Sequence, residues 1–213
     1  MTDSLKKYAA ALLCGGRSRR MGRDKALALR DRQGRPLLAA LAEELAGRFG
    51  EVVLIADRRS KLEALPELAR FTALEDLHPG AGPAGAIDTA LQGRPGQTIF
   101  VMACDMPVIN WAVIEKTRLC LENRRADVAM PRRGDVREPL CAFYGPEAGP
   151  AFQAALAAGR RAVLDCCDGL KVVHPDLSQE DLASGFGLNL NTPADLRAAG
   201  LPPAAGGTNP GED

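Results

Sequence analysis

The feature that most constrains the fold is a series of short apolar runs separated by longer amphipathic segments. The runs are continuously apolar, whereas a strand with one face in water alternates apolar and polar residues. Continuous runs are typical of parallel strands that helices cover on both faces. The predicted strands are residues 8–13, 51–56, 97–104, 126–131 and 170–175.

The intervening segments have the 3.6-residue periodicity of amphipathic helices. In residues 35–50, Pro36 lies near the predicted first turn and Gly50 marks the predicted end. One face of that segment carries five large apolar residues: Leu37, Leu38, Leu41, Leu45 and Phe49. Residues 109–125, 146–161 and 192–200 are predicted to be further helices, the last with Thr192 as N-cap and Pro193 at its first position.

Strands that alternate with helices predict an α/β fold. We expect a three-layer, Rossmann-like domain with a predominantly parallel sheet and right-handed crossovers. The length of 213 residues suits one domain, which we assign to residues 1–200. Residues 201–213 are rich in Pro, Gly and acidic residues, and we expect them to be disordered.

A basic, glycine-containing segment, LLCGGRSRRMGRDKAL (12–27), follows the first predicted strand. It therefore occupies the first strand-to-helix loop, at the carboxyl edge where open α/β sheets bind ligands. Gly15 and Gly16 permit tight or left-handed backbone that exposes N–H groups to phosphate oxygens. Arg20 and Lys25 add positive charge suited to phosphate. The alternative is a solvated basic loop.

The basic charge of this loop is local. The 27 Lys and Arg residues balance the 27 Asp and Glu residues, so the chain has no global field that attracts nucleic acid or an anionic membrane. The loop is not a Walker A loop, because Gly22 is followed by Arg23 and not by Lys and Ser or Thr. Its glycines also miss the spacing of the dinucleotide GxGxxG motif. We therefore expect a small anionic ligand.

Three more segments support a nucleotide-phosphate and metal site. Asp105 ends an apolar strand in VMACDMP, where its carboxylate suits Mg²⁺ beside phosphates, although a simple turn before Pro107 is the alternative. Residues 75–87 form a Gly-rich connection that lets a ligand approach the backbone, or else a flexible surface loop. Asn189 and Asn191 precede the capped helix, either as ligand contacts or as turn formers.

The compartment is predicted from the cysteines and from the missing targeting signals. The six cysteines form no CxxC pair and no metal spacing, so we expect free thiols in a reduced, cytoplasmic setting. The adjacent Cys166 and Cys167 are either buried neighbours, which we favour, or a redox pair. Residues 1–10 lack the apolar region of a signal peptide, and no run reaches the length of a membrane span.

The motifs together resemble a known family. LCGGRSRRMGRDKAL resembles the L-x-G-G-x-S-x-R-M-G-x-D-K signature of small nucleotidyltransferases that act on molybdopterin, the molybdenum cofactor guanylyltransferase family. The segments GPAGAI, CDMP, EPLCAFY and NLNTPADL follow in the order of that family, and the resemblance covers about residues 8–199. It implies a nucleotidyltransferase fold, Mg²⁺ dependence and a cytoplasmic enzyme that transfers GMP from GTP to Mo-molybdopterin with release of pyrophosphate.

The resemblance also implies roles for individual residues. Arg20 and Lys25 would contact the phosphates, and Asp105 would bind Mg²⁺. Asp76 would bind the nucleotide, and Asn189 and Asn191 would lie near the pterin. The backbone of four residues would surround the guanine nucleotide: Leu13, Cys14, Gly15 and Gly16. Molybdoenzyme chaperones or insertion proteins are the expected partners. We do not expect the protein to bind nucleic acid or a membrane.

Three alternatives remain. A related enzyme would use CTP, although the Gly15–Gly16 pair favours GTP, because the cytidylyl relatives tend to have Ala-Gly there. A second would act on another phosphorylated acceptor, such as a sugar phosphate. A third is a non-catalytic module that only binds nucleotide; the presence of Arg20, Lys25 and Asp105 together opposes it.

Overall fold

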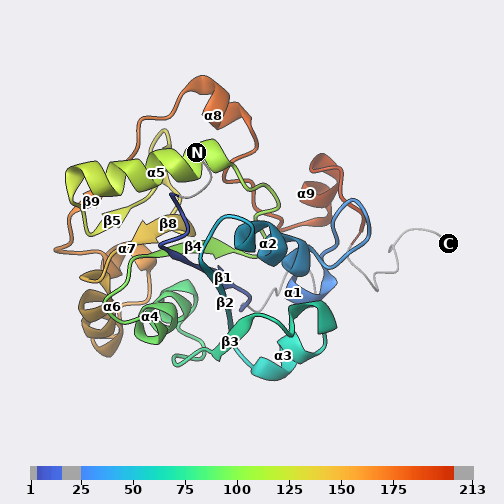
Figure 1. Cartoon of the computed structure of the whole chain (residues 1–213), viewed down its shortest axis with the longest axis horizontal. Helices are drawn as coiled ribbons and strands as arrows, with labels where there is room; N and C mark the ends of the chain where they lie inside the picture. The colour runs from blue at the N-terminus through green and yellow to red at the C-terminus, as the bar shows by residue number, and fades with distance from the viewer. Residues whose placement is uncertain (1–3, 16–24, 204–213) are drawn as a thin grey trace.

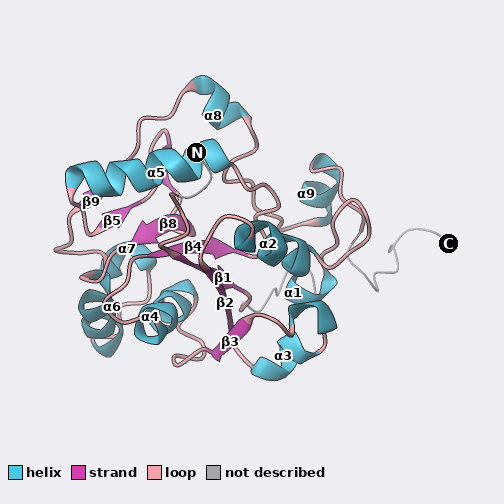
Figure 2. Cartoon of the chain, viewed as in Figure 1, coloured by secondary structure: helices cyan, strands magenta, loops and turns pink. Residues whose placement is uncertain are grey.

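The computed structural model describes residues 4–15 and 25–203, apart from the side chains of Lys25 and Ala26. Seven strands form one sheet in the order β3-β2-β1-β4-β8-β5-β9 (Figure 2). They are β1 (Ala9–Leu13), β2 (Glu51–Ala56), β3 (Thr72–Glu75), β4 (Ile99–Ala103), β5 (Val128–Ala129), β8 (Cys141–Tyr144) and β9 (Val172–Val173), and β6 (Arg132–Arg133) and β7 (Val136–Arg137) form a separate hairpin.

The connections between the strands contain most of the helices. These are α1 (Lys25–Ala28), α2 (Leu37–Ala46), α3 (Arg59–Glu63), the short 3-10 helix η1 (Pro66–Leu68), α4 (Pro83–Gly93), α5 (Trp111–Arg124), α6 (Ala148–Ala157), α7 (Val163–Cys166), α8 (Gln179–Ala183) and α9 (Pro193–Ala198).

The sheet is predominantly parallel, as the apolar runs predicted. The β3-β2-β1-β4 half is parallel throughout, and β5 pairs in parallel with β9. Only β8 is antiparallel, to β4 on one side and β5 on the other. Because β8 alone is reversed, the carboxyl ends of β1, β2, β3, β4, β5 and β9 lie at one edge of the sheet. We call this the carboxyl edge.

Helices cover both faces of the sheet, which explains why its inner strands are apolar without alternation (Figure 1). All five residues of β1 are buried. Leu12 packs in the core on the α2 and α5 face, whereas Ala11 and Leu13 pack in the core on the face of α4, α6 and α7. The two cores make the three layers that the sequence predicted.

The residues that were predicted to begin and end the helices are confirmed in part. The Thr192 side chain accepts a hydrogen bond from the Asp195 backbone N–H, and Pro193 is the first residue of α9, as predicted. Helix α2 instead ends at Ala46, before the predicted Gly50. Gly50 is needed for another reason, because a Cβ there would lie 2.1 Å from the carbonyl oxygen of Lys6.

The sequence analysis missed two strands of the main sheet, β3 and β8, and both strands of the β6–β7 hairpin. Strand β3 has only four residues and none of them is buried, so it lacks an apolar run. Strand β8 is fully buried but is also four residues long and lies within the EPLCAFY segment. The tail prediction concerns residues 201–213, of which 204–213 lie outside the described residues. The single domain over residues 1–200 stays a prediction.

All six cysteines are free and buried, as expected. Burial raises the pKa of Cys167 to about 12, with a further contribution from Cys166, and burial also raises the pKa of Cys166. A thiol with a raised pKa is a poor nucleophile at neutral pH because little thiolate is present. The structure therefore favours buried neighbours over a redox pair.

Glu122 connects the segment before β1 to helix α5. Its Oε1 accepts a hydrogen bond from the Tyr8 hydroxyl at 2.5 Å and pairs with Lys7 at 2.9 Å, and Oε2 accepts from Arg118 at 2.5 Å. Burial acts to raise the pKa of Glu122, but the hydrogen bonds from these donors outweigh it and lower the pKa to about 2.

We expect Glu122→Gln to lower the melting temperature by a few degrees at pH 7. Because the folded pKa is depressed, the stabilisation by Glu122 is fully present above its ordinary value of 4.5 and is lost as the pH falls towards about 2. Thermal unfolding of both proteins across this range should show the gap closing as the pH falls. A gap that does not depend on pH would contradict this account.

Candidate functional site

The candidate site begins where β1 ends, at the middle of the carboxyl edge. The Cys14 backbone N–H donates to the Ile55 carbonyl at 2.7 Å, and the Cys104 N–H donates to the Leu13 carbonyl at 3.1 Å. These bonds join the ends of β1, β2 and β4, so Leu13 and Cys14 are fixed by the sheet. Gly15 is the first exposed residue beyond them.

Gly15 does not adopt the positive φ that the sequence analysis allowed for it, so left-handed backbone is not the reason for a glycine here. Among the described residues, a Cβ at Gly15 would come closest to the backbone nitrogen of Asp57, at 3.6 Å, which is an ordinary contact. Packing against the described residues therefore does not require a glycine at this position. A glycine does let a ligand approach the backbone closely.

Most of the basic loop, residues 16–24, lies outside the described residues. Gly16 and Arg20 lie outside the described residues, as does the side chain of Lys25, whose backbone begins α1. The structure does show the two ends of the loop, Gly15 and Lys25. The first of these lies at the carboxyl edge.

Asp105 lies at the same edge, two residues beyond β4. It is half-buried, and its carbonyl oxygen accepts a hydrogen bond from the Leu190 backbone N–H at 2.9 Å. Strands β1 and β4 are direct neighbours, with Leu13 opposite Ala103. The structure therefore brings Asp105 and Gly15 to adjacent strand ends, as the sequence analysis predicted.

Asp76 follows β3 and organises the Gly-rich connection. Its Oδ1 accepts hydrogen bonds from the His78 backbone N–H at 2.9 Å and from the Thr89 hydroxyl at 3.2 Å. The other oxygen, Oδ2, forms no hydrogen bond or ion pair to any side chain or backbone group that the structure describes. Asp76 thus holds its loop with one oxygen and has the second available for a ligand.

A histidine–aspartate pair anchors the same loop to α4. His78 Nε2 lies 2.6 Å from Oδ2 of Asp88, which is fully buried on α4 and also accepts from Gln92 at 2.6 Å. Gly85 allows this approach, because a Cβ there would lie 2.9 Å from the His78 Cβ. The Gly-rich connection is therefore a fixed part of the carboxyl edge, and the alternative of a flexible surface loop is not favoured. Sequence reasoning missed this pair. The pattern that could have indicated it was Asp88, an acidic residue within an otherwise apolar helix.

The two asparagines lie close to Asp105. Asn189 is half-buried and its amide donates to the Gly187 carbonyl at 3.2 Å. Asn191 is exposed, and its backbone N–H donates to the Asp195 carboxylate at 2.8 Å. The Leu190 bond to Asp105 lies between them. Both asparagines therefore flank the residue that bonds to Asp105, and the Asn191 backbone also takes part in the cap of α9.

Sequence reasoning also missed two acidic residues near this edge. Asp57 follows β2 directly and forms an ion pair with Lys61 on α3. Glu138, in the EPLCAFY segment, is buried and pairs with Arg133 at 3.1 Å. The position of Asp57 after an apolar run was a usable signal, identical in kind to that of Asp105. Nothing in the pattern around Glu138 indicated burial.

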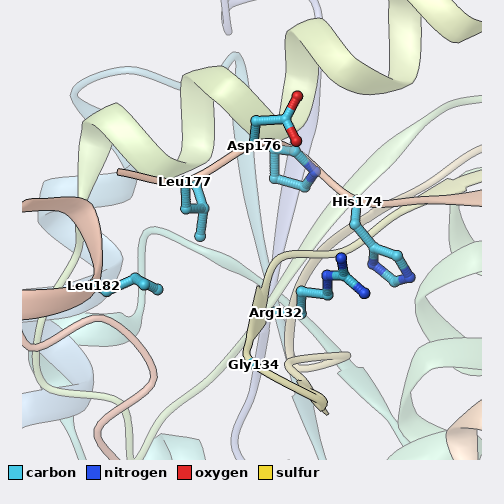
Figure 3. A pocket seen from close by; sticks show the side chains of 7 residues that line it. Arg132, Gly134, His174, Asp176, Leu177 and Leu182 are labelled. Atoms are coloured by element: carbon cyan, nitrogen blue, oxygen red, sulfur yellow. The ribbon is translucent and has the colours of Figure 1, made fainter. Parts of the chain in front are cut away.

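A cavity of about 270 Å³ lies at the far end of the carboxyl edge, beside the ends of β5 and β9. Figure 3 shows the Arg132 and His174 side chains together on one side of it, and Leu177 and Leu182 on the other. The His174 ring Nδ1 lies 2.8 Å from the Met130 carbonyl and joins β9 to β5. This contact gives His174 a structural role beside the ends of the two strands.

The described residues contain no group of three or more His, Cys, Asp or Glu side chains placed to hold a metal. Nor does any helix in the described ranges combine the length and apolar character of a membrane span.

Comparisons with known proteins show which family the chain resembles. A model of the MobA-like NTP transferase domain matches residues 10–175. The "Probable molybdenum cofactor guanylyltransferase" of Methanothermobacter thermautotrophicus is 30% identical over 194 residues, which cover 89% of this chain and 97% of that protein. The molybdenum cofactor guanylyltransferase of Syntrophotalea carbinolica is 32% identical over 201 residues, 90% of each chain.

A solved structure has the same fold. The crystal structure of molybdopterin-guanine dinucleotide biosynthesis protein A from Archaeoglobus fulgidus superposes with a TM-score of 0.77 at 29% identity, covering 90% of this chain and 96% of that one. The family model spans most of the chain, and the relatives match it over nearly their whole lengths. The chain therefore belongs to the MobA-like NTP transferase family and is a nucleotidyltransferase.

Proposed function

We propose that this protein is a molybdenum cofactor guanylyltransferase, which transfers GMP from GTP to Mo-molybdopterin and releases pyrophosphate. The observation that carries the proposal is that Gly15, Asp76 and Asp105 each follow a parallel strand at the same edge of the sheet, and that the signature segment begins at this edge. Relatives named for this activity match the chain over about nine-tenths of its length.

The reaction needs no nucleophile from the protein. A phosphate oxygen of the acceptor attacks the α-phosphorus of GTP, and the bond to the β-phosphate oxygen breaks as pyrophosphate leaves. Such a transfer depends on positioning the two substrates and on neutralising negative charge. The backbone from Leu13 to Gly16 holds the nucleotide, and Arg20 and Lys25 contact its phosphates. Asp76 binds the nucleotide through the oxygen that its loop leaves available.

Asp105 is the residue proposed to hold Mg²⁺. Its carboxylate is the hard oxygen ligand that Mg²⁺ prefers, and Asp105 follows the strand next to the one that Gly15 follows, where the phosphates would be. A site with a single protein carboxylate suits Mg²⁺, which commonly keeps several waters and is bound with substrate phosphates. When bound, Mg²⁺ neutralises charge on the phosphates. The Leu190 N–H donates a hydrogen bond to the Asp105 carbonyl, which fixes the backbone of Asp105 at this edge.

The acceptor is proposed to bind beyond Asp105, on the side of Asn189 and Asn191. The half-buried Asn189 supports this placement because it lies next to the Leu190–Asp105 hydrogen bond. We further propose a cytoplasmic setting, which the six free cysteines support, with molybdoenzyme chaperones or insertion proteins as partners.

We expect GTP with Mg²⁺ to stabilise the protein against thermal unfolding more than CTP does. A ligand that binds only the folded state adds about 2.7 kcal/mol at a hundredfold excess over its Kd, which corresponds to several degrees in a chain of this size. Thermal-shift titrations with GTP, CTP, ATP and UTP, with and without Mg²⁺, measure this directly.

Each outcome of these titrations selects one assignment. Equal or stronger stabilisation by CTP would overturn the guanylyl assignment and leave nucleotidyl transfer in place. If GTP stabilises the protein equally with and without Mg²⁺, and the protein shows no turnover, the result would favour a module that only binds nucleotide.

A further inference from the structure

We infer that Glu138 and Arg133 are positioning residues for the proposed reaction: they fix the segment that places Asn189 and the Asp105 backbone. This inference rests on the proposed function. The segment is residues 185–191, called the asparagine loop below. It lies between the β6–β7 hairpin and the end of β4, and it forms hydrogen bonds to both.

The hairpin side of this arrangement is an ion pair between the buried Glu138 and the exposed Arg133. Glu138 is buried, and its Oε1 accepts a hydrogen bond from Arg133 Nη2 at 3.1 Å. The Glu138 backbone N–H donates to the Pro131 carbonyl at 2.9 Å, which extends the hairpin pairing by one residue. A buried carboxylate is costly unless it is paired, so Glu138 fixes the position of the Arg133 guanidinium.

Arg133 in turn holds the asparagine loop. The same Nη2 donates to the Gly187 carbonyl at 3.3 Å, and this carbonyl also accepts from the Asn189 amide at 3.2 Å. Gly187 has a φ of 73°, and a Cβ there would lie 2.8 Å from Glu138 Oε1 and 3.1 Å from Arg133 Nε. Only glycine allows the loop to pack so closely against the ion pair.

The other side of the loop reaches the proposed metal ligand. The Leu190 N–H donates to the Asp105 carbonyl at 2.9 Å, and the Leu190 side chain is fully buried. A second connection runs through the chain itself, because the Leu140 carbonyl, two residues after Glu138, accepts from the Ala103 N–H at 3.1 Å. Displacement of the ion pair would therefore move both Asn189 and the backbone of Asp105.

The test compares Glu138→Gln with Asp135→Asn in the full-length protein. Both changes remove one carboxylate from the hairpin region, but Asp135 is exposed at the hairpin tip. We expect Glu138→Gln to raise the KM for Mo-molybdopterin about fivefold, as loss of a charged hydrogen bond would. The KM for GTP should rise by less than the KM for the acceptor, because Asp105 is also held by the chain that leaves β4, and Asp135→Asn should match the wild type in both. Arg133→Lys keeps a cation beside Glu138 and should retain most of the activity.

Hydrogen exchange of the Leu190 amide gives a readout that needs no substrate. We expect faster exchange at Leu190 in Glu138→Gln and in Gly187→Ala, and no change in Asp135→Asn. Unchanged exchange at Leu190, or equal losses in the use of GTP and of acceptor, would overturn the positioning role. If the wild type transfers no nucleotide, the proposed function fails, whereas the exchange measurement still decides whether Glu138 holds the loop.

Discussion

Asp105→Asn is expected to lower turnover about 100-fold while the fold survives. The substitution keeps the size of the side chain and the backbone bond to Leu190, but it removes the negative charge proposed to hold Mg²⁺. Loss of one contact that stabilises charge in the transition state costs on the order of 3 kcal/mol. Steady-state kinetics with GTP and Mg²⁺ measure the loss, and an unchanged melting temperature shows that the fold is intact.

Asp57→Asn provides a matched control for this prediction. Asp57 also follows a strand at the carboxyl edge, but it is engaged in an ion pair with Lys61. Its loss should therefore change turnover far less. Near-normal turnover of Asp105→Asn would show that another carboxylate holds the metal, with Asp76 as the first candidate.

The arginines of the basic loop are expected to differ in their effects. Arg20→Ala and Lys25→Ala should each weaken the use of GTP at least about 10-fold, equivalent to about 1.4 kcal/mol. Arg20 occupies the fixed arginine of the signature before Met21-Gly22, and Lys25 follows Asp24 at the start of α1. Both are positioned in the sequence to reach the phosphates of a nucleotide at Gly15.

Arg17→Ala and Arg23→Ala are the controls, since they fall on variable positions of the signature. Their kcat/KM for GTP should stay within a few-fold of the wild-type value, because a charge that makes no contact with the ligand contributes little to binding. Values of kcat/KM for GTP on the four single variants decide the matter. Equally mild effects in all four would mean that the cluster is only a solvated basic face.

The fold was predictable where burial leaves a strong pattern. The apolar runs within residues 51–56 and 97–104 correspond to β2 and β4. Strands that are covered on both faces are apolar along nearly their whole length. Strand β3 was not predictable, because none of its four residues is buried and its sequence therefore lacks an apolar run. The reversed direction of β8 was not predictable either. Strand direction depends on the path of the chain, here through the β6–β7 hairpin, and not on local composition.

The site was predictable at strand ends and poorly predictable elsewhere. Asp105 was found because a carboxylate after a buried strand lies at the carboxyl edge of a parallel sheet. Asp76 came from family resemblance alone, since its strand was not recognised. Glu138 and Asp88 were missed because their importance comes from burial and from contacts with other elements: Glu138 pairs with Arg133, which bonds to the asparagine loop, and Asp88 contacts His78.

Transfer of label from GTP tests the central proposal most directly. The purified protein would be incubated with Mg²⁺, Mo-molybdopterin and GTP labelled at the α-phosphate, with labelled CTP in a parallel reaction. Guanylyl transfer predicts that label from GTP enters the pterin product with release of one pyrophosphate for each label transferred, and that CTP supports much less transfer. Label that remains in GTP, or transfer that prefers CTP, would contradict the proposal.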